Sequence, residues 1–392
     1  MHFTATPPSA ASNRPRRSTA ALRVRRLLPA HLSRAEVEHW ERLSDHSLSP
    51  NPFLSPHFTL PLLQHLPPDL PVRMLVVEDE ASGEWRAAGV FEITSPSMRQ
   101  PLAYAQGLSS SYAFLDGLLI DRRDAARTVQ AMFYDQFQHR DWHGFHFSAI
   151  HTNSPLDRLL HFTAQKLGMS IFYPRRWDRA QFSTHQSISK EEIVQQCSKS
   201  RRKSLRRGRR LLDDQGNVTF QLRRATGGSD SCVDGFLRLE AMGWKGAQGT
   251  AIACSPPREA FFRNLVENFS QKRDVLFGEL RLDNQLIAST CNIRSAETLT
   301  AFKIGWDPSF ADAGIGLWSE IELAAAVCQN LPEIAYIDSS AKEGSYVESV
   351  WLDRQPMHSV TYSWSRRGCA LQSARQYYYW LKRLMPQSQL TH

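Results

Sequence analysis

The chain has 392 residues, of which 42% are hydrophobic and 22% are charged, a composition that allows an ordinary folded core. This length predicts two domains or one large domain. No apolar run reaches the roughly 18 residues that a membrane-spanning helix needs, so we expect no membrane span. The six cysteines form no C-x-x-C pair, and their spacing predicts neither a zinc site nor a disulfide framework, which favours a reducing cytoplasm.

The formal net charge of +8 comes from one segment. Residues 199–210 carry eight basic side chains and no acidic one, and basic and acidic residues balance in the rest of the chain. The question of an anionic partner therefore concerns this segment and not the surface as a whole.

The N-terminal half alternates strand and helix patterns. Residues 1–22 are rich in Ser, Ala, Thr, Pro and Arg, lack the apolar segment of a secretory signal, and predict a disordered tail. Strands are predicted at residues 23–28, 74–77, 85–93, 145–150 and 169–173, an extended segment at 113–120, and helices at 34–43, 56–65, 124–138 and 155–167. His143 and His146 would point to opposite faces of one strand, so no metal site is expected there.

The C-terminal half repeats this order of meander, helix and strand. Strands are predicted at residues 217–224, 275–281, 286–294, 299–306, 334–338 and 360–364, and helices at 233–243, 258–270, 317–330 and a last segment ending at 384. The two halves share this pattern but no residue-level repeat, so the duplication is a prediction from pattern alone. The fold class predicted is α/β (α+β).

The basic segment lies in a predicted helix. Ser189 and Glu192 form a capping box and Gly216 lies beyond the far end, so residues 190–213 are expected to form one helix. A stripe of small or apolar residues suited to packing follows it: Ile193, Cys197, Ser200, Ser204, Gly208 and Leu211. The surrounding basic side chains include Arg206 and Arg207, and three interpretations of them are open: a solvated face, a site for a phosphorylated or otherwise polyanionic ligand, or a site for nucleic acid. No aromatic residue interrupts the basic run, which disfavours single-stranded nucleic acid.

A strand, a glycine-containing turn and a helix follow one another between residues 299 and 330. The turn contains Gly314 and Gly316, and the helical pattern starts directly after it. The first N–H groups of a helix lack internal partners, and the helix dipole favours negative charge there. We therefore expect an anion site at this turn, where two close glycines allow a pyrophosphate to approach the backbone.

This turn resembles the acyl-CoA-binding core of the GNAT acetyltransferase superfamily. Gly314 and Gly316 match the small positions of its motif [QR]-x-x-G-x-[GA], while Ala311 stands where the family usually has Gln or Arg. A second stretch, residues 240–252, resembles the E…GWKG..GTA signature of CelD-like, cellulose-biosynthesis-type acetyltransferases. Residues 51–56 (NPFLSP) resemble the opening segment of that family.

Further matches to that family lie near the C-terminus, in Ile337 to Ser340 and in Trp351 to Arg354, and its frequent Tyr-Lys pair is Tyr346-Val347 here. The resemblance implies tandem GNAT-like halves, each a mixed, mostly antiparallel sheet flanked by helices, as in FemAB-type transferases. It implies a tail at 1–22, an N-terminal GNAT-like domain at 23–185 and a C-terminal acyltransferase domain at 186–392 that begins with the basic helix.

The resemblance also implies acetyl-CoA or another acyl-CoA as co-substrate, without a metal. Its pantetheine arm would lie between the strands at 299–306 and 334–338. The residues expected to bind it are Lys303, Gly314, Ile315, Gly316 and Leu317. Asp338 or Glu240 would act as the base, and the alternatives are a helix cap for Asp338 and a surface charge for Glu240.

The acceptor implied is a sugar, an amine or a phosphorylated molecule. The residues expected to contact it are Trp244, Lys245, Tyr346, Trp351, Arg354, Arg206 and Arg207, although both tryptophans could instead be core residues. The function implied is N- or O-acyl transfer, with acetyl as the expected group, in polysaccharide or cell-envelope biosynthesis. Two alternatives stay open: a FemAB-like aminoacyl transferase that uses charged tRNA, and a GNAT-fold binding protein without catalysis.

Overall fold

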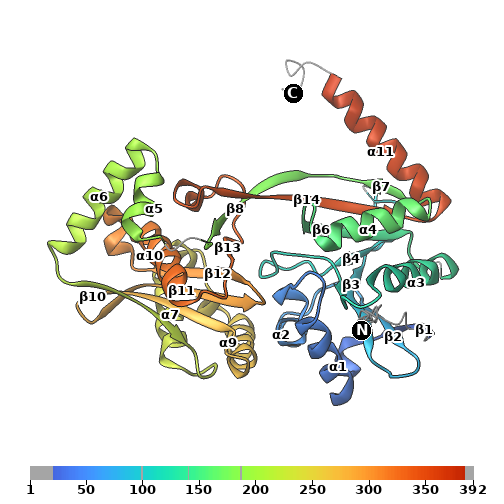
Figure 1. Cartoon of the computed structure of the whole chain (residues 1–392), viewed down its shortest axis with the longest axis horizontal. Helices are drawn as coiled ribbons and strands as arrows, with labels where there is room; N and C mark the ends of the chain where they lie inside the picture. Colours follow the sequence, from blue (N-terminus) through green and yellow to red (C-terminus); the bar gives the residue numbers. More distant parts are fainter. Residues whose placement is uncertain (1–20, 99, 140, 186–187, 385–392) are drawn as a thin grey trace, which may run out of the picture.

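The computed structural model describes residues 21–384 except 99, 140 and 186–187 (Figure 1). Nearly all of the predicted N-terminal tail thus lies outside the described residues. In the described part, fourteen strands form one sheet in the order β1-β2-β3-β4-β6-β14-β8-β13-β12-β11-β10-β9, with β5 beside β3 and β7 beside β14. Neighbouring strands are antiparallel except β4–β6 and β12–β13, which are parallel.

The strands are β1 (Leu22–Leu27), β2 (Val72–Asp79), β3 (Trp85–Ile93), β4 (Ala105–Gly107), β5 (Leu119–Ile120), β6 (Gly144–His151), β7 (Ser170–Phe172), β8 (Arg176–Ser183), β9 (Val218–Arg224), β10 (Val275–Leu282), β11 (Gln285–Ser295), β12 (Thr298–Trp306), β13 (Tyr336–Asp338) and β14 (Asp353–Ser363). In the segment predicted as extended at 113–120, residues 113–118 belong to no strand or helix, and β5 forms the last two residues.

The helices are α1 (Arg34–Asp45), α2 (Pro56–His65), α3 (Ala125–Gln138), α4 (Pro155–Lys166), α5 (Lys190–Gln196), α6 (Lys199–Asp213), α7 (Ser231–Met242), α8 (Trp244–Ala247), α9 (Pro256–Gln271), α10 (Ile315–Asn330) and α11 (Arg366–Leu384). Strands β1–β7 with α1–α4 make up the first half, and β9–β13 with α5–α10 the second half (Figure 1). The predicted fold, a mixed and mostly antiparallel sheet flanked by helices in both halves, is confirmed.

The two halves are joined by strands as well as by packing. The long strands β8 and β14 cross between them: β8 pairs with β13, and β14 pairs with β6 and β7 of the first half (Figure 1). On one face, Phe58 of α2 packs edge-on against Phe261 of α9 at 5.7 Å between ring centroids. The division at residues 185/186 stays a prediction, since the chain returns to the first half near its end.

The basic segment differs from its prediction, because it forms two helices and not one. Cys197 is extended, and the Ser198 hydroxyl accepts a hydrogen bond from the Arg201 N–H group, which starts α6 anew. This break shifts the buried stripe by one residue. On α6 the buried side is formed by Leu205, Gly208 and Leu212, whereas Ser200 and Ser204 are exposed.

Gly208 brings α6 against the segment that precedes α10. A Cβ atom at Gly208 would lie 2.1 Å from the Ala313 carbonyl oxygen, closer than any real contact. The Trp318 indole N–H of α10 donates to the Leu205 carbonyl of α6 at 3.2 Å, which fixes the same approach. The basic helix therefore lies directly beside the turn at Gly314.

This contact makes a prediction that opposes helix propensity. Replacing glycine by alanine inside a helix is usually stabilising by ~1 kcal/mol. Gly208→Ala should instead destabilise the protein by ~1–3 kcal/mol, because the new methyl group meets a backbone carbonyl that cannot move freely. Denaturant unfolding measures this change, with Ser204→Ala on the exposed side of α6 as the control. A stabilised Gly208→Ala variant would contradict the close approach.

Candidate functional site

Strands β12 and β13 run in parallel for only three residue pairs and then separate. Thr298, Leu299 and Thr300 pair with residues 336–338, and no pairing follows. The reason is local: the Asp338 carboxylate accepts a hydrogen bond from the Ser340 N–H group at 2.7 Å, which turns the chain away from the sheet. Beyond this point the two strands leave a gap in the sheet.

A pocket of about 170 Å³ lies in this gap, and we call it the splay pocket. It is lined by residues of β12, α8, α10 and the segment after β13. Four residues predicted for the site meet in it: Lys245, Lys303, Tyr346 and Trp351. Glu320, which the sequence analysis did not single out, lines it as well.

Glu320 is a buried carboxyl group in the splay pocket. The Tyr346 hydroxyl donates to one of its oxygens at 3.5 Å, and the other oxygen has no partner among the described residues. Burial raises the pKa of Glu320 to about 8, so the group is protonated at neutral pH. The sequence signal for it was an acidic residue inside the otherwise apolar pattern of α10.

Lys303 lies over an aromatic wall. Its ammonium group is 4.7 Å from the ring centroid of Tyr112 and 5.1 Å from that of Phe114, which is cation–π geometry. Burial, and then the positive charge of Lys245, lower the pKa of Lys303 to about 8. The splay pocket therefore holds the positive charge of Lys303, a Lys245 whose charge is paired with Glu240, and a neutral carboxyl group.

Glu240 is not the surface charge that one interpretation of the sequence expected. Its side chain is buried, accepts a hydrogen bond from the Ile252 N–H group at 2.7 Å and lies 3.2 Å from the Lys245 ammonium group. Lys245 also donates to the Ile304 carbonyl at 3.3 Å. Glu240 thus holds the loop after α8 and the lysine of the pocket, and it does not line the pocket itself.

The turn before α10 has the conformation that its glycine predicts. Gly314 adopts a left-handed backbone (φ 66°) and caps the helix. Its own N–H group donates to the Ala311 carbonyl, and the Leu317 N–H group donates to the Gly314 carbonyl. Ile315 is fully buried, so the anion contact expected at this turn falls to the N–H group of Gly316, which is partly exposed. A Cβ atom on Gly316 would come no closer than 3.4 Å to any neighbour, the indole of Trp306.

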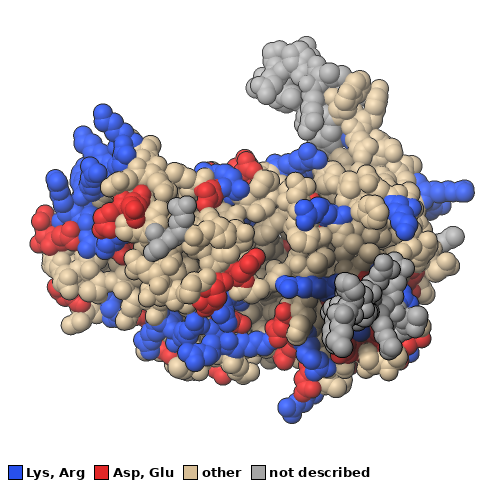
Figure 2. Space-filling model, viewed as in Figure 1, with Lys and Arg blue, Asp and Glu red and all other residues tan. Residues whose placement is uncertain are grey.

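The remaining predicted residues have different surroundings. Trp351 is fully buried and its indole N–H donates to the Glu320 carbonyl, so it is a core residue at the base of the pocket. Arg354 donates to three backbone carbonyls, those of residues 348, 351 and 353, and so holds its own loop. Trp244 begins α8. Arg206 and Arg207 are exposed on α6, within the dense group of basic side chains over this helix in Figure 2.

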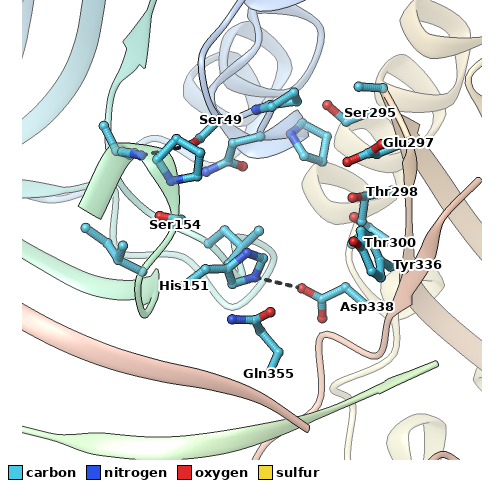
Figure 3. Close-up of a pocket in the computed structure, with 18 of the residues that line it drawn as sticks. Ser49, His151, Ser154, Ser295, Glu297, Thr298, Thr300, Tyr336, Asp338 and Gln355 are labelled. Atoms are coloured by element: carbon cyan, nitrogen blue, oxygen red, sulfur yellow. Dashed lines mark hydrogen bonds and ion pairs between the residues drawn. The ribbon is translucent and has the colours of Figure 1, made fainter. Parts of the chain in front are cut away.

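A second, larger cavity of about 620 Å³ lies between the two halves, and we call it the inter-half cavity (Figure 3). Asp338 of β13 lines it and lies 3.3 Å from the His151 Nε2 atom of β6 and 3.2 Å from an Arg179 guanidinium nitrogen of β8. Burial alone would raise the pKa of Asp338, but Arg179 and the His151 hydrogen bond hold it well below its usual range. Asp338 is therefore a carboxylate and a weak proton acceptor.

The sequence analysis missed His151 and Arg179. They are 187 and 159 residues from Asp338 in the chain, and neither belongs to a recognisable motif. One interpretation of the sequence made Asp338 a helix cap, but it caps the turn at Ser340 instead.

Within the described residues, no group of three or more His, Cys, Asp and Glu side chains is placed to hold a metal ion. No helix in that part of the chain is long and apolar enough to cross a membrane.

Comparison with known proteins agrees with this geometry. Residues 199–344 match the family model of an acetyltransferase (GNAT) domain, and this range includes the basic helix α6, the Gly314 turn and the part of the splay pocket lined by Lys245, Lys303 and Glu320. The whole chain is similar in fold to FemX, with 9% sequence identity, coverage of 88% of this chain and 99% of that one, and a TM-score of 0.52. A search of curated proteins gives no match.

Another similar structure is a conserved protein of unknown function from Bacteroides thetaiotaomicron VPI-5482, with 12% identity, coverage of 84% and 97%, and a TM-score of 0.51. A tandem GNAT protein from the clavulanic acid biosynthesis pathway has 12% identity, coverage of 88% and 98%, and a TM-score of 0.44. Residues 199–344 thus resemble a GNAT acetyltransferase domain, and the larger fold around them is similar to that of FemX. The resemblance to CelD-like proteins stays a prediction.

The protonation state of Glu320 can be tested through stability. Its pKa is about 8 in the folded protein against an ordinary value of 4.5, so the folded state holds an extra proton between these pH values and stability falls as pH rises through them. Glu320→Gln carries no such proton. The stability of Glu320→Gln relative to wild type should therefore increase from pH 5 to pH 8, by on the order of a few kcal/mol in the free energy of unfolding. Melting temperatures of both proteins across this pH range measure the change. A difference that is constant with pH would contradict a buried, protonated Glu320.

Proposed function

We propose that the protein is an acyl-CoA-dependent N- or O-acyltransferase, with acetyl as the group transferred, that acts in polysaccharide or cell-envelope biosynthesis. The observation that supports this most is the separation of β12 and β13 beside the N-terminus of α10. A gap between parallel strands exposes backbone groups to a pantetheine arm, and the helix N-terminus next to it suits a pyrophosphate.

The residues of the splay pocket fit an anionic donor. Lys303 supplies positive charge at the pocket, Lys245 lies beside it in an ion pair with Glu240, and the partly exposed Gly316 offers its N–H group at the turn. Acyl transfer from a thioester needs little covalent help from protein beyond holding the reactants, stabilising the oxyanion and moving a proton. Tyr346, half-exposed and held by Glu320, is placed to give a proton to the departing thiolate.

The two carboxylates predicted as the base, Glu240 and Asp338, differ in their access to the cavities. Glu240 is bound to Lys245 and a backbone N–H group and has no face on either cavity. Asp338 does face the inter-half cavity, one residue from Ser339 of the splay pocket. We therefore place the acceptor on the Asp338 side.

A binding protein without catalysis would bind acyl-CoA but release no thiol in the presence of any acceptor.

The donor site is tested at Gly316. A carboxylate at this position would repel the pyrophosphate, so Gly316→Glu should weaken acetyl-CoA binding at least tenfold, or about 1.4 kcal/mol. Gly316→Ala is the matched control, because its methyl group has room beside Trp306 and carries no charge. Isothermal titration with acetyl-CoA measures both variants. Equal affinity of wild type and Gly316→Glu would remove the turn from the donor site.

The alternative function is a FemAB-like aminoacyl transferase, and the exposed Arg206 and Arg207 on α6 are the feature that favours it. The basic side chains would neutralise many phosphates of a long polyanion such as tRNA at once. The logarithm of its affinity would then fall with the logarithm of the salt concentration, with a slope of roughly −0.7 per phosphate contacted on a single strand. We expect only a shallow slope, because no aromatic residue lies within the basic run for bases to stack on.

Binding of tRNA to wild type and to the double variant Arg206→Glu/Arg207→Glu, measured across a salt series, decides between them. Under the proposed function, tRNA binds weakly to both proteins and its affinity depends little on salt. Tight and steeply salt-dependent tRNA binding that the double variant abolishes would favour the aminoacyl transferase.

A further inference from the structure

The inter-half cavity has the size and position of a substrate site. Its volume of about 620 Å³ lies within the range of ~300–1,000 Å³ that is usual for small-molecule sites. Both halves line it, with His151 on β6 of the first half and Asp338 on β13 of the second (Figure 3). The cavity and the splay pocket are lined from the same two segments: Thr300 and Asp338 line the cavity, and Ala301 and Ser339, the residues that follow them, line the pocket.

We propose that this cavity binds the acyl acceptor, a sugar or amino sugar without phosphate, and that His151 takes the proton from its attacking hydroxyl or amine. The proposal rests on the acyl transfer proposed above and assigns the acceptor and the base for that reaction.

The cavity wall favours an uncharged or cationic polyol. Besides Arg122, His151 and Asp338, polar groups that can exchange hydrogen bonds with sugar hydroxyls line it, among them Ser49, Ser154, Gln181, Glu297, Thr298 and Gln355. Pro50 and Tyr336 add apolar surface for a sugar ring to cover. These six polar side chains include one carboxylate and no cation.

A phosphate would find little to bind it in the cavity. Of the described residues that line the cavity, Arg122 is the one Lys or Arg, and its Nε atom already donates to the Ser47 carbonyl at 3.2 Å. Glu297 and Asp338 would repel an anion. One buried hydroxyl of the cavity lacks a hydrogen-bond partner. Thr300 lines the cavity, and its Oγ1 atom has no hydrogen bond within the described part of the chain. A bound sugar hydroxyl would satisfy it.

His151 is held in the orientation that a general base needs. Its Nε2 atom lies 3.3 Å from the Asp338 carboxylate, and this contact is the dashed line in Figure 3. Asp338 is fixed in turn by Arg179 and by the Ser340 N–H group. With Nε2–H donating to Asp338, Nδ1 is the acceptor nitrogen of the ring. The His151 side chain is 30% exposed, so a ligand in the cavity can reach it.

The proton and electron balance of the step is simple. The acceptor's lone pair forms a bond to the thioester carbonyl carbon while its proton passes to the imidazole of His151. The Asp338 carboxylate stabilises the imidazolium that results. Collapse of the tetrahedral intermediate breaks the carbon–sulfur bond, and the leaving thiolate takes a proton from the Tyr346 hydroxyl. The proton on His151 then returns to Tyr346 through solvent, which restores both groups. The products are the acylated sugar and free CoA.

The substrate class is tested with acetyl-CoA and four acceptors on the full chain. The probes are glucose, glucosamine, glucose 6-phosphate and glucosamine 6-phosphate, and the readout is thiol release. We expect kcat/KM for glucose or glucosamine to exceed that for its own phosphate ester at least tenfold. A preference for the phosphate esters, or no thiol release with any of the four, would overturn the assignment of the acceptor.

The base is tested with His151→Ala and added imidazole. Loss of a general base costs ~10²–10⁴ in rate, and a small base that enters the vacated space should restore part of it. His161→Ala is the control, because this histidine of α4 lies outside the cavity and contacts Tyr173. We expect kcat to fall at least a hundredfold in His151→Ala only, with imidazole raising it again and with unchanged affinity for acetyl-CoA.

Full turnover by His151→Ala would overturn the role of His151, and so would a loss that imidazole does not repair. These outcomes differ from failure of the proposed function. If wild type does not bind acetyl-CoA in a calorimetric titration, the acyl transfer itself is wrong. If it binds acetyl-CoA and His151→Ala remains active, only the base assigned to the reaction is wrong.

Discussion

A buried ion pair between Arg179 and Asp338 joins the two halves at the point where β12 and β13 separate. Both side chains are about 5% exposed, and Arg179 also donates to the Phe114 carbonyl of the first half at 2.7 Å. Burying two charges is costly and is repaid only when geometry and additional hydrogen bonds are good. Loss of one partner of such a pair typically costs about 3–5 kcal/mol, since the other charge stays buried and unpaired. The position of His151 depends on the same carboxylate.

Two carboxyl groups near this point are held in opposite protonation states by their surroundings. Asp338 has a guanidinium beside it and remains ionised, whereas Glu320 has only a tyrosine hydroxyl and is protonated at neutral pH. Environments that separate the pKa values of neighbouring groups in this way are typical of acid–base chemistry. Here the ionised group lies in the inter-half cavity and the protonated one in the splay pocket, on the two sides of the strand separation.

The sequence predicted those parts of the fold that depend on neighbouring residues. The strand, turn and helix from β12 to α10 were found because their periodicity is local and Gly314 needs a left-handed backbone. The break at Cys197 was missed because the capping signal of Ser198 lies inside a continuous basic run. His151 and Arg179 were missed for another reason. Only the crossing strands β8 and β14 bring them to Asp338, and no local pattern encodes such a crossing.

Charge differs between the two sides of the site, and under the proposed function this difference would order the reactants. On the donor side lie Lys245, Lys303 and the basic helix α6, which Gly208 brings against the turn at Gly314. On the acceptor side lie the carboxylates of Asp338 and Glu297. An anionic donor is therefore attracted to one side and repelled from the other, while a neutral or cationic acceptor has the reverse preference. The strand separation is the place where the two preferences meet, and a thioester carbonyl held there would face His151 across the ion pair that fixes the fold.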